Sequence, residues 1–570
     1  MNPKQLKELA DNLFSKRGSL VSLWQAIAEL FYVERADFTA TRSLGEDFAA
    51  HLSSSFTLLC RRDLGDQIGV MLRPTQKPWF HMVPRDTRIE DNTSRRWLEW
   101  AEGTQRRAMY DRVTFFNRAM KEGDHDYAAF GQCVPSVELN RFRSALLYRN
   151  WHLKDVVWRE NQDGEIDFVA RRWKVALSDL IKLFPKAELD VKIRQRALKN
   201  PFDEITVLHI VCDMDLYDGD FTMEPGMYPE ADQESYRSDY QRHVRGRAKK
   251  LSLFYDCEHE KPIEAKGIRT KIYVVQRWQT VSGSQYAFSP ASVAALPEGR
   301  LLQAMTLTLL EAGEKAVNPP LIATKDVVKS DMQQFPGGVT WVDAEYDERL
   351  GEALRAMNID VKGLPISLEM VKDSRAVLQQ CFFLNKLRAF NPTTDPQMTA
   401  FQAGQIVQEY IRGALPLFEP MEMDRNGALC EETFDVLYMN GAFGSPLDIP
   451  PPLKNADIDW RFESPLHDAI EQQKGIKFLE FKQIVAEAMA LDPSAAHIPD
   501  AKTILRDVAN GIRVPATWMR TELQVEEASA AAADAKRQAA TLATLQQGAD
   551  VAATLGAARK DAAQAAASGA

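Results

Sequence analysis

The spacing of the apolar residues changes twice along this chain of 570 residues, and this limits the fold more than any other feature. Apolar side chains recur at helical spacing in 4–31, 48–71 and 94–124, which predicts helices there. After Gly131 the pattern becomes that of strands up to residue 281, with Asp163-Gly164 placed as a hairpin turn would be. Helical spacing then returns. The expected fold class is α+β, predominantly helical.

The second half is predicted as two helices around a small β-containing segment. The first helix must end before the proline pair at 319–320, because proline cannot continue a helix. The second helix spans 367–384, and two prolines keep the following loop, 385–397, irregular. A longer helix restarts where Thr399 and Gln402 fit a capping box. The apolar residues of the first two helices are Leu301, Leu302, Met305, Leu309 and Ala312, then Leu368, Val371, Leu378 and Phe382.

The last 45 residues, from Glu526, are unusually rich in alanine. Alanine is the best helix former, and a fully helical tail would reach about 65 Å. The tail has only four large apolar side chains with which to pack against a core: Leu542, Leu545, Val551 and Leu555. Two alternatives follow: a disordered tail, or a helix that packs through small side chains against other long helices.

Composition excludes several classes of protein. A net charge of −10 argues against a protein that coats nucleic acid, which needs a basic face. The N-terminus lacks the apolar core of a signal peptide, and no stretch is apolar enough to span a membrane, so we expect the protein in the cytoplasm. The six cysteines form no CxxC pair, which favours reduced, mostly buried thiols.

A search for catalytic motifs finds none. The GxxxxGK[ST], GxGxxG, HExxH and GxSxG patterns are absent, so we expect no catalytic residue, cofactor or metal site. Asp124-His125-Asp126 is the densest group of metal-ligand types, but on a helix its side chains point in three directions, which favours a solvated helix end. For Cys257 and His259 a structural role is favoured over metal binding.

Two groups of cations are candidates for contact with nucleic acid. The run from Arg242 to Lys250 is better explained as a solvated face, although contact with phosphate is the alternative. Lys386 and Arg388 lie in the proline-bounded loop between two long helices. That loop can project cations into whatever space the helices surround.

Five passages, in register, resemble the portal (head-to-tail connecting) proteins of short-tailed bacteriophages. The first is "ALPEGRLLQAMTLTLLEAGEKAVNPPLIATKDVV", followed by "PGGVTWVD" and "MTAFQAGQIVQEYIRGALPLFEPMEMDRNGALCEETFDVLYMNG". Upstream, "FTLLCRRDLGDQIGVMLRPTQKPWFHM" and "HDYAAFGQCVPSVE" continue the resemblance. The similar region covers roughly residues 45 to 450, while 455–525 match poorly.

The resemblance implies a portal-type subunit that forms a ring of twelve around a DNA channel at one capsid vertex. By position, 1–296 resemble the wing, 297–316 and 367–384 the stem helices, 317–366 the clip and 385–397 the tunnel loop. Residues 398–440 resemble the long helices of the wing or crown, 441–526 the crown, and 527–570 a barrel helix or a flexible tail.

The resemblance also implies site residues and partners. They are Lys386, Arg388 and Phe390 in the tunnel loop, Lys372 and Arg375 on the stem wall, and Asp326, Lys329, Gln334 and Trp341 on the clip. The implied partners are further copies of the chain, double-stranded DNA, the terminase large subunit (the packaging motor), a tail adaptor, the major capsid and scaffold proteins, and internal core proteins at the barrel, with no membrane. The implied location is the virion, after assembly in the host cytoplasm.

Two alternatives from other classes stay open at the level of sequence. An internal virion hydrolase would use some of the many Asp and Glu residues, although no motif supports it. Another structural capsid or scaffold component would also form oligomers but would lack an axial DNA channel.

Overall fold

The computed structural model describes residues 1–43, 45–75, 77–86, 91–185, 189, 191–223, 250–317, 319–323, 341, 354–356, 363–385, 421–444, 449–454, 456–462, 483, 514, 516–520 and 522–567. The chain divides into two compact units. The first comprises Met1–Trp79, Gln105–Ala442 and Phe462–Leu466, and the second comprises Phe80–Thr104, Phe443–Arg461 and His467–Ala570. The capping box predicted at Thr399 and the turns predicted at 336–338 lie outside the described residues.

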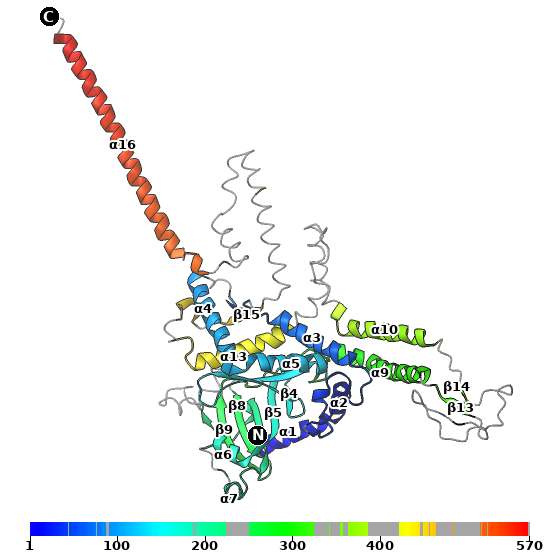
Figure 1. Cartoon of the computed structure of the whole chain (residues 1–570). Coiled ribbons are helices and arrows are strands. Elements are labelled where there is room, and N and C mark those ends of the chain that lie inside the picture. The colour runs from blue at the N-terminus through cyan, green and yellow to red at the C-terminus, as the bar shows by residue number, and fades with distance from the viewer. Residues whose placement is uncertain are drawn as a thin grey trace. The chain divides into compact units, whose positions relative to one another are not determined.

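The largest sheet of the first unit has six strands in the order β4-β5-β6-β8-β9-β7 (Figure 1). Neighbouring strands are antiparallel, except that β7 and β9 are parallel. The hairpin predicted at Asp163-Gly164 is confirmed, and Gly164 takes the left-handed conformation with φ 83°. The strands are β4 (Val156–Glu160), β5 (Ile166–Ala176), β6 (Glu204–Asp213), β7 (Thr222–Met223), β8 (Lys250–Asp256) and β9 (Lys261–Ile268).

One face of this sheet is apolar and is covered by helix α1 (Pro3–Lys16). The strands alternate, so every second residue faces the helix. Burying this face removes apolar area from water and fixes the register of the strands. The buried cluster comprises Leu6, Ala10 and Leu13 of α1 with Val157, Phe168, Ala170, Leu208, Ile210, Cys212, Leu251, Leu253 and Tyr255 of the sheet.

The first predicted helices are confirmed as α1 and α2 (Gly18–Phe31), but the next one begins later than expected. Helix α3 spans Phe56–Leu72, whereas residues 48–55 form turns. The backbone N–H groups of Ser53 and Ser54 donate to the side-chain oxygen of Gln303, both at 2.8 Å, in place of helical hydrogen bonds. A contact from a distant segment therefore moves the start of the helix.

The single helix predicted over 94–124 is wrong, because the chain forms two. Helix α4 spans Asn92–Met109 and α5 spans Phe116–Phe130. Between them the Asp111 carboxylate accepts a hydrogen bond from the N–H of Val113, and Phe115 has a left-handed φ of 56°. Such a side-chain bond competes with the helix and ends it.

Strand β2 (Gln132–Leu139) follows α5 directly and pairs with β3 (Leu146–Trp151) and β10 (Gln276–Arg277) in a three-stranded sheet. The strand signal predicted from Gly131 to residue 281 ends in the short strands β10 and β11 (Gln279–Thr280), the second of which pairs with β12 (Ala287–Phe288). Gly131 makes the step from helix to strand with φ 74°.

Two helices predicted in the second half are confirmed with shifted ends. Helix α9 spans Pro290–Val317 and α10 spans Gly363–Cys381, and they lie side by side (Figure 1). Helix α9 stops before the proline pair as expected, but it begins earlier and contains Pro297. Strands β13 (Leu321–Ala323) and β14 (Leu354–Ala356) pair antiparallel at the far end. Further on, α13 (Ala428–Met439) follows a π-helical turn at Glu422–Gly427.

The second unit contains a two-stranded sheet of β1 (Phe80–Pro84) and β15 (Ile458–Phe462). The carbonyl of Met519 accepts hydrogen bonds from Asn92 at 2.9 Å and Arg96 at 2.6 Å, which fixes the segment before the tail to α4. The tail is one continuous helix, α16 (Glu522–Ala567), 46 residues long. Of the two alternatives for the tail, disordered or helical, this agrees with the helical one. That such helices pack together in a barrel stays a prediction. Among the described residues, no helix has the length and hydropathy needed to span a membrane.

We predict that Gly131→Ala destabilises the first unit by several kcal/mol. A Cβ at this position would lie 2.1 Å from the carbonyl carbon of Phe288, in a backbone conformation that L residues rarely adopt. The control is Gly103→Ala, in the interior of α4, where nothing lies within 4 Å of the added atom. The control should gain about 1 kcal/mol. Urea unfolding of both variants tests this, and equal stability of the two would contradict it.

Candidate functional site

The hairpin of α9 and α10 has an inner face and an outer face. On α10 the side chains of Val371, Ser374 and Leu378 are buried at a spacing of three and four residues. On α9, Gly299 and Leu302 are buried, and a Cβ on Gly299 would lie 3.1 Å from the Phe31 ring. The base of the hairpin is thus packed against the N-terminal helices.

The described site residues predicted from the resemblance lie at the surface. Lys372 and Arg375 are exposed on α10, and the Arg375 guanidinium lies 5.4 Å from the centroid of the Phe56 ring. Trp341 is 70% exposed. The remaining predicted site residues lie outside the described residues: Lys386, Arg388, Phe390, Asp326, Lys329 and Gln334.

The outer face of the hairpin exposes large apolar side chains in both helices. The predicted stripes are therefore only partly buried: Leu302, Val371, Leu378 and Phe382 are in the core, whereas Leu301 and Leu368 are exposed. Exposed apolar side chains gathered on one hairpin often mark a contact with another chain. The exposed apolar residues are Leu301, Leu307, Leu310 and Val317 on α9, with Ile366, Leu368, Met370 and Val377 on α10.

Asp124-His125-Asp126 is buried, so the prediction of a solvated helix end is wrong. The three side chains do point in different directions, and each meets a different arginine. The Asp124 carboxylate accepts hydrogen bonds from Arg73 and from Arg425, which itself is only 1% exposed. Asp124 thereby joins α5 to the end of α3 and to the π-helical turn. A buried carboxylate persists only when such partners compensate its lost hydration.

His125 meets a third arginine and is held neutral. Its Nδ1 lies 3.1 Å from a guanidinium nitrogen of Arg61, and burial followed by that positive charge lowers its pKa. Helix α3 allows this approach because it has glycine at both contact points: a Cβ on Gly65 would lie 2.3 Å from His125, and one on Gly69 would lie 2.8 Å from Asp124. This glycine pair, four residues apart, is the one sequence signal that could have revealed the buried cluster.

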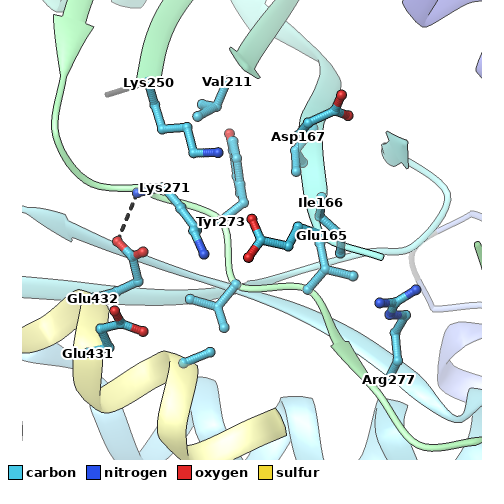
Figure 2. Close-up of a pocket in the computed structure, with 14 residues that line it drawn as sticks. Glu165, Ile166, Asp167, Val211, Lys250, Lys271, Tyr273, Arg277, Glu431 and Glu432 are labelled. Atoms are coloured by element: carbon cyan, nitrogen blue, oxygen red, sulfur yellow. Dashed lines mark hydrogen bonds between the residues drawn. The ribbon is translucent and has the colours of Figure 1, made fainter. Parts of the chain in front are cut away.

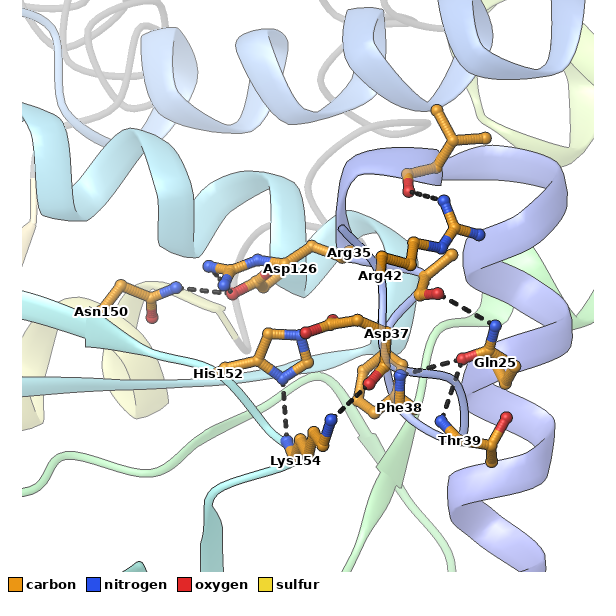
Figure 3. A network of polar contacts seen from close by, with 12 residues as sticks. Gln25, Arg35, Asp37, Phe38, Thr39, Arg42, Asp126, Asn150, His152 and Lys154 are labelled. Atoms are coloured by element: carbon orange, nitrogen blue, oxygen red, sulfur yellow. Dashed lines mark hydrogen bonds and ion pairs between the residues drawn. The ribbon is translucent and has the colours of Figure 1, made fainter. Parts of the chain in front are cut away.

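Asp126 extends the cluster into a wider polar network (Figure 3). Its carboxylate accepts two hydrogen bonds from Arg35 at 3.2 Å and one from Asn150 at 2.5 Å. In the same region Gln25 accepts from the backbone of Phe38 at 2.9 Å. The Lys154 ammonium donates to the carbonyl of Asp37. The network ties the loop after α2 to α5 and β3, which is a structural role.

A separate pocket of about 180 Å³ lies beside the six-stranded sheet and is lined by charged residues of both signs (Figure 2). The Glu432 carboxylate accepts a hydrogen bond of 2.8 Å from the backbone N–H of Lys271. Burial raises the pKa of Glu432 to about 7, although that hydrogen bond opposes the shift.

Lys250 also lines the pocket, but its ammonium is paired with Asp213 directly opposite in the sheet. For Lys250 the predicted solvated face is therefore wrong, while Arg242 and the rest of that run lie outside the described residues.

Nothing in the described parts of the chain forms a group of three residues suited to hold a metal ion. The Asp256 carboxylate accepts a hydrogen bond of 2.6 Å from Nδ1 of His259, three residues further on in the same turn, which is a structural contact. None of the six cysteines, all of which are described, forms a disulfide, and four of them are buried. Burial raises the pKa of Cys133 and Cys212 to about 12, which keeps both thiols protonated and unreactive.

A family model described as "Bacteriophage head to tail connecting protein" matches residues 3–519. This chain belongs to that family. The resemblance inferred from the sequence passages is thereby confirmed, and the family match also extends over 455–519, where the motifs match poorly. The family is structural, which fits the expectation that the protein is not an enzyme.

Two curated relatives carry names consistent with the family. The chain is 22% identical over 553 residues to the "Probable portal protein" of Bordetella phage BPP-1, covering 95% of this chain and 93% of the relative. It is 21% identical over 200 residues to the "Portal protein" of Salmonella phage epsilon15, covering 35% of each. The first similarity extends over the whole fold rather than over one segment.

We predict that Asp124→Asn lowers the free energy of unfolding by about 3–5 kcal/mol, because Arg73 and Arg425 would stay buried without a counter-charge. The control is Asp66→Asn, whose carboxylate is 45% exposed and lies 3.3 Å from Lys121. The control should lose less than about 1 kcal/mol. Urea denaturation measures both, and a small loss for Asp124→Asn would show that the buried cluster does not hold the helices together.

The pKa of Glu432 predicts a pH dependence of stability. The folded state keeps the proton up to about pH 7, whereas the unfolded chain releases it near 4.5, so the unfolded chain binds fewer protons in that window. Stability therefore falls as pH rises from 4.5 to 7, by up to about 3 kcal/mol. In Glu432→Gln this contribution should vanish, while in Glu431→Gln, at the exposed neighbouring carboxylate, it should remain. Thermal melts across that pH range would contradict this if wild type and Glu432→Gln changed in parallel.

Proposed function

We propose that this chain is the subunit of a portal, a ring at one vertex of a phage capsid through which double-stranded DNA is packaged, retained and ejected. The observation that carries this proposal, beside the family, is the hairpin of α9 and α10 with its exposed apolar side chains. A ring of copies would bury these side chains between neighbouring hairpins. A dodecamer is the proposed assembly.

The proposed subdomains follow the positions inferred from the resemblance. Residues 1–296 would form the wing, 297–316 and 367–384 the stem, 317–366 the clip and 385–397 the tunnel loop. The paired strands β13 and β14 lie within the proposed clip, which supports a small β-containing module there. Residues 398–440 and 441–526 would form the long helices and the crown.

The proposed channel must pass a highly charged polymer without holding it. The net charge of −10 supplies weak repulsion, and a sparse ring of cations would touch phosphates only transiently. Exposed Lys372 and Arg375 on α10 are the described candidates, with Lys386, Arg388 and Phe390 in the tunnel loop. Repetition around a ring would make weak contacts effective.

The proposed partners bind at the two ends of the ring. The clip, with Asp326, Lys329, Gln334 and exposed Trp341, would meet the terminase large subunit during packaging and the tail adaptor later. The wing would face the major capsid and scaffold proteins. We place the protein in the virion, after assembly in the host cytoplasm.

Helix α16 is proposed as one of the parallel helices of a barrel near the internal core proteins. Leu542 and Val551 are nine residues apart, about two and a half turns, so they point to opposite sides of the helix. Both are more than half exposed, as are Leu545 and Leu555. A helix in a closed ring has a neighbour on each side, and apolar residues on two flanks suit that arrangement.

The test of the proposal is electron microscopy of the purified chain, with rotational averaging. Wild type should form rings with a central hole of about 20 Å or more, the width of duplex DNA. The double variant Leu307→Asp, Leu310→Asp should remain folded by circular dichroism but lose the rings, because it places charge in the contact between hairpins. Phe142→Asp, at an exposed apolar side chain in the turn between β2 and β3, is the matched control. Persistent wild-type monomers would overturn the portal proposal, and intact rings in the double variant would remove the hairpin from the contact.

A further inference from the structure

The face of the six-stranded sheet opposite α1 carries buried polar residues at its centre, beside an apolar cluster that includes Ile205 and Val207. Arg171 in β5, His209 in β6 and Phe254 in β8 stand opposite one another in register, so they share this face. Arg171 and His209 are buried. A sheet that only needed a second layer of core would carry apolar residues at these positions, because buried polar groups are costly without partners.

This face forms one wall of a cavity of about 630 Å³. The other walls come from β2, β3, the segment after β9 and the end of α13. Six basic side chains line it against two carboxylates, a formal excess of four positive charges. The basic residues are Arg141, Arg143, Arg149, Arg171, Lys266 and Arg269, and the acidic residues are Glu138 and Glu264.

Arg171 is buried at this cavity with very little hydrogen bonding. Its guanidinium carbon lies 3.7 Å from the ring centroid of Trp151 and 3.8 Å from that of Trp173, so two indoles hold it in place. Its Nε donates to the hydroxyl of Tyr273 at 2.9 Å. No described carboxylate forms an ion pair with it, so the terminal Nη groups still lack an anionic acceptor.

On the opposite wall, Arg269 also lacks an anionic acceptor among the described residues. Its terminal nitrogen meets only the sulfur of Met439, at 3.4 Å, and thioether sulfur is a weak acceptor. Its Nε is buried and has no hydrogen-bond partner. Buried polar groups are rarely left in this state, so each such group calls for an explanation.

The two carboxylates in the cavity do not remove the excess of positive charge. Glu264 is paired with Lys266 at 2.8 Å. Burial raises the pKa of Glu138, although the charges of Arg171 and Arg149 oppose that shift. The lining of the cavity therefore keeps its formal excess of positive charge.

The aromatic residues around the cavity are already stacked on one another. His209 lies on Phe254 with ring centroids 4.0 Å apart and planes only 1° from parallel. Its two nitrogens bond the hydroxyls of Tyr273 at 2.6 Å and Ser252 at 2.8 Å, and burial keeps its pKa well below the usual value. The cavity therefore offers guanidinium groups rather than free ring faces, which selects oxyanions over a flat aromatic ligand.

We propose that this cavity binds a small multivalent oxyanion, one that carries two or more phosphate or carboxylate groups. Arg171 and Arg269 would bind it from opposite walls, while exposed Arg141 and Arg149 would draw it in. The volume is in the range of small-ligand sites, and guanidinium forks match the geometry of both groups. The site is independent of the hairpin, so it goes beyond the proposed portal function.

Isothermal titration calorimetry of the full chain with pyrophosphate, at fixed ionic strength, tests the proposal. Saturable binding with one site per chain is expected. Arg269→Gln should weaken binding about ten- to a hundredfold, as expected for the loss of a charge-assisted hydrogen bond. Arg118→Gln is the matched control, because Arg118 is exposed on α5 and does not line the cavity. It should bind as wild type does.

A replacement variant and a second anion complete the experiment. If Arg269→Gln fails to fold, the exposed pair Arg141→Gln, Arg149→Gln replaces it, and the expected loss is of the same size. Citrate in place of pyrophosphate distinguishes carboxylate from phosphate as the preferred group. Absence of binding by both anions, or equal weakening in Arg118→Gln, would overturn the proposal. Ring formation is scored separately, so failure here leaves the portal proposal untouched.

Discussion

The buried carboxylate of Asp124 is the interaction on which the rest of the first unit depends. It draws together Arg73 at the end of α3 and Arg425 in the π-helical turn, 51 and 301 residues away along the chain. Glycines at 65 and 69 let α5 come close enough for these contacts. Because two buried guanidiniums would be left without a counter-charge if the carboxylate were lost, the helices around it have one favourable arrangement.

The hairpin of α9 and α10 keeps large apolar side chains exposed. Its buried residues anchor the base, while Leu307 and Leu310 are about half exposed. In the ring that we propose, these apolar side chains would meet a neighbouring subunit, while exposed Lys372 would face the channel.

The six-stranded sheet separates two tasks by the alternation of its strands. Its apolar face packs on α1 and supplies stability. Its other face carries Arg171 and His209 into a cavity with a clear excess of positive charge. Tryptophan rings hold the Arg171 guanidinium without neutralising it. Such an arrangement stabilises the protein less than an apolar layer would, which is why we assign the cavity to ligand binding.

The sequence by itself determined what depends on neighbouring residues: the helices and strands from their periodicity, the stop at the proline pair, the turn at Gly164, and the family from passages in register. Tertiary structure decided what depends on distant partners. It buried Asp124 and Asp126, ended a helix at Met109, moved the start of α3 through Gln303, and paired Lys250 with Asp213. A charge on an isolated helix belongs in water, and only an opposite charge brought by folding reverses that preference.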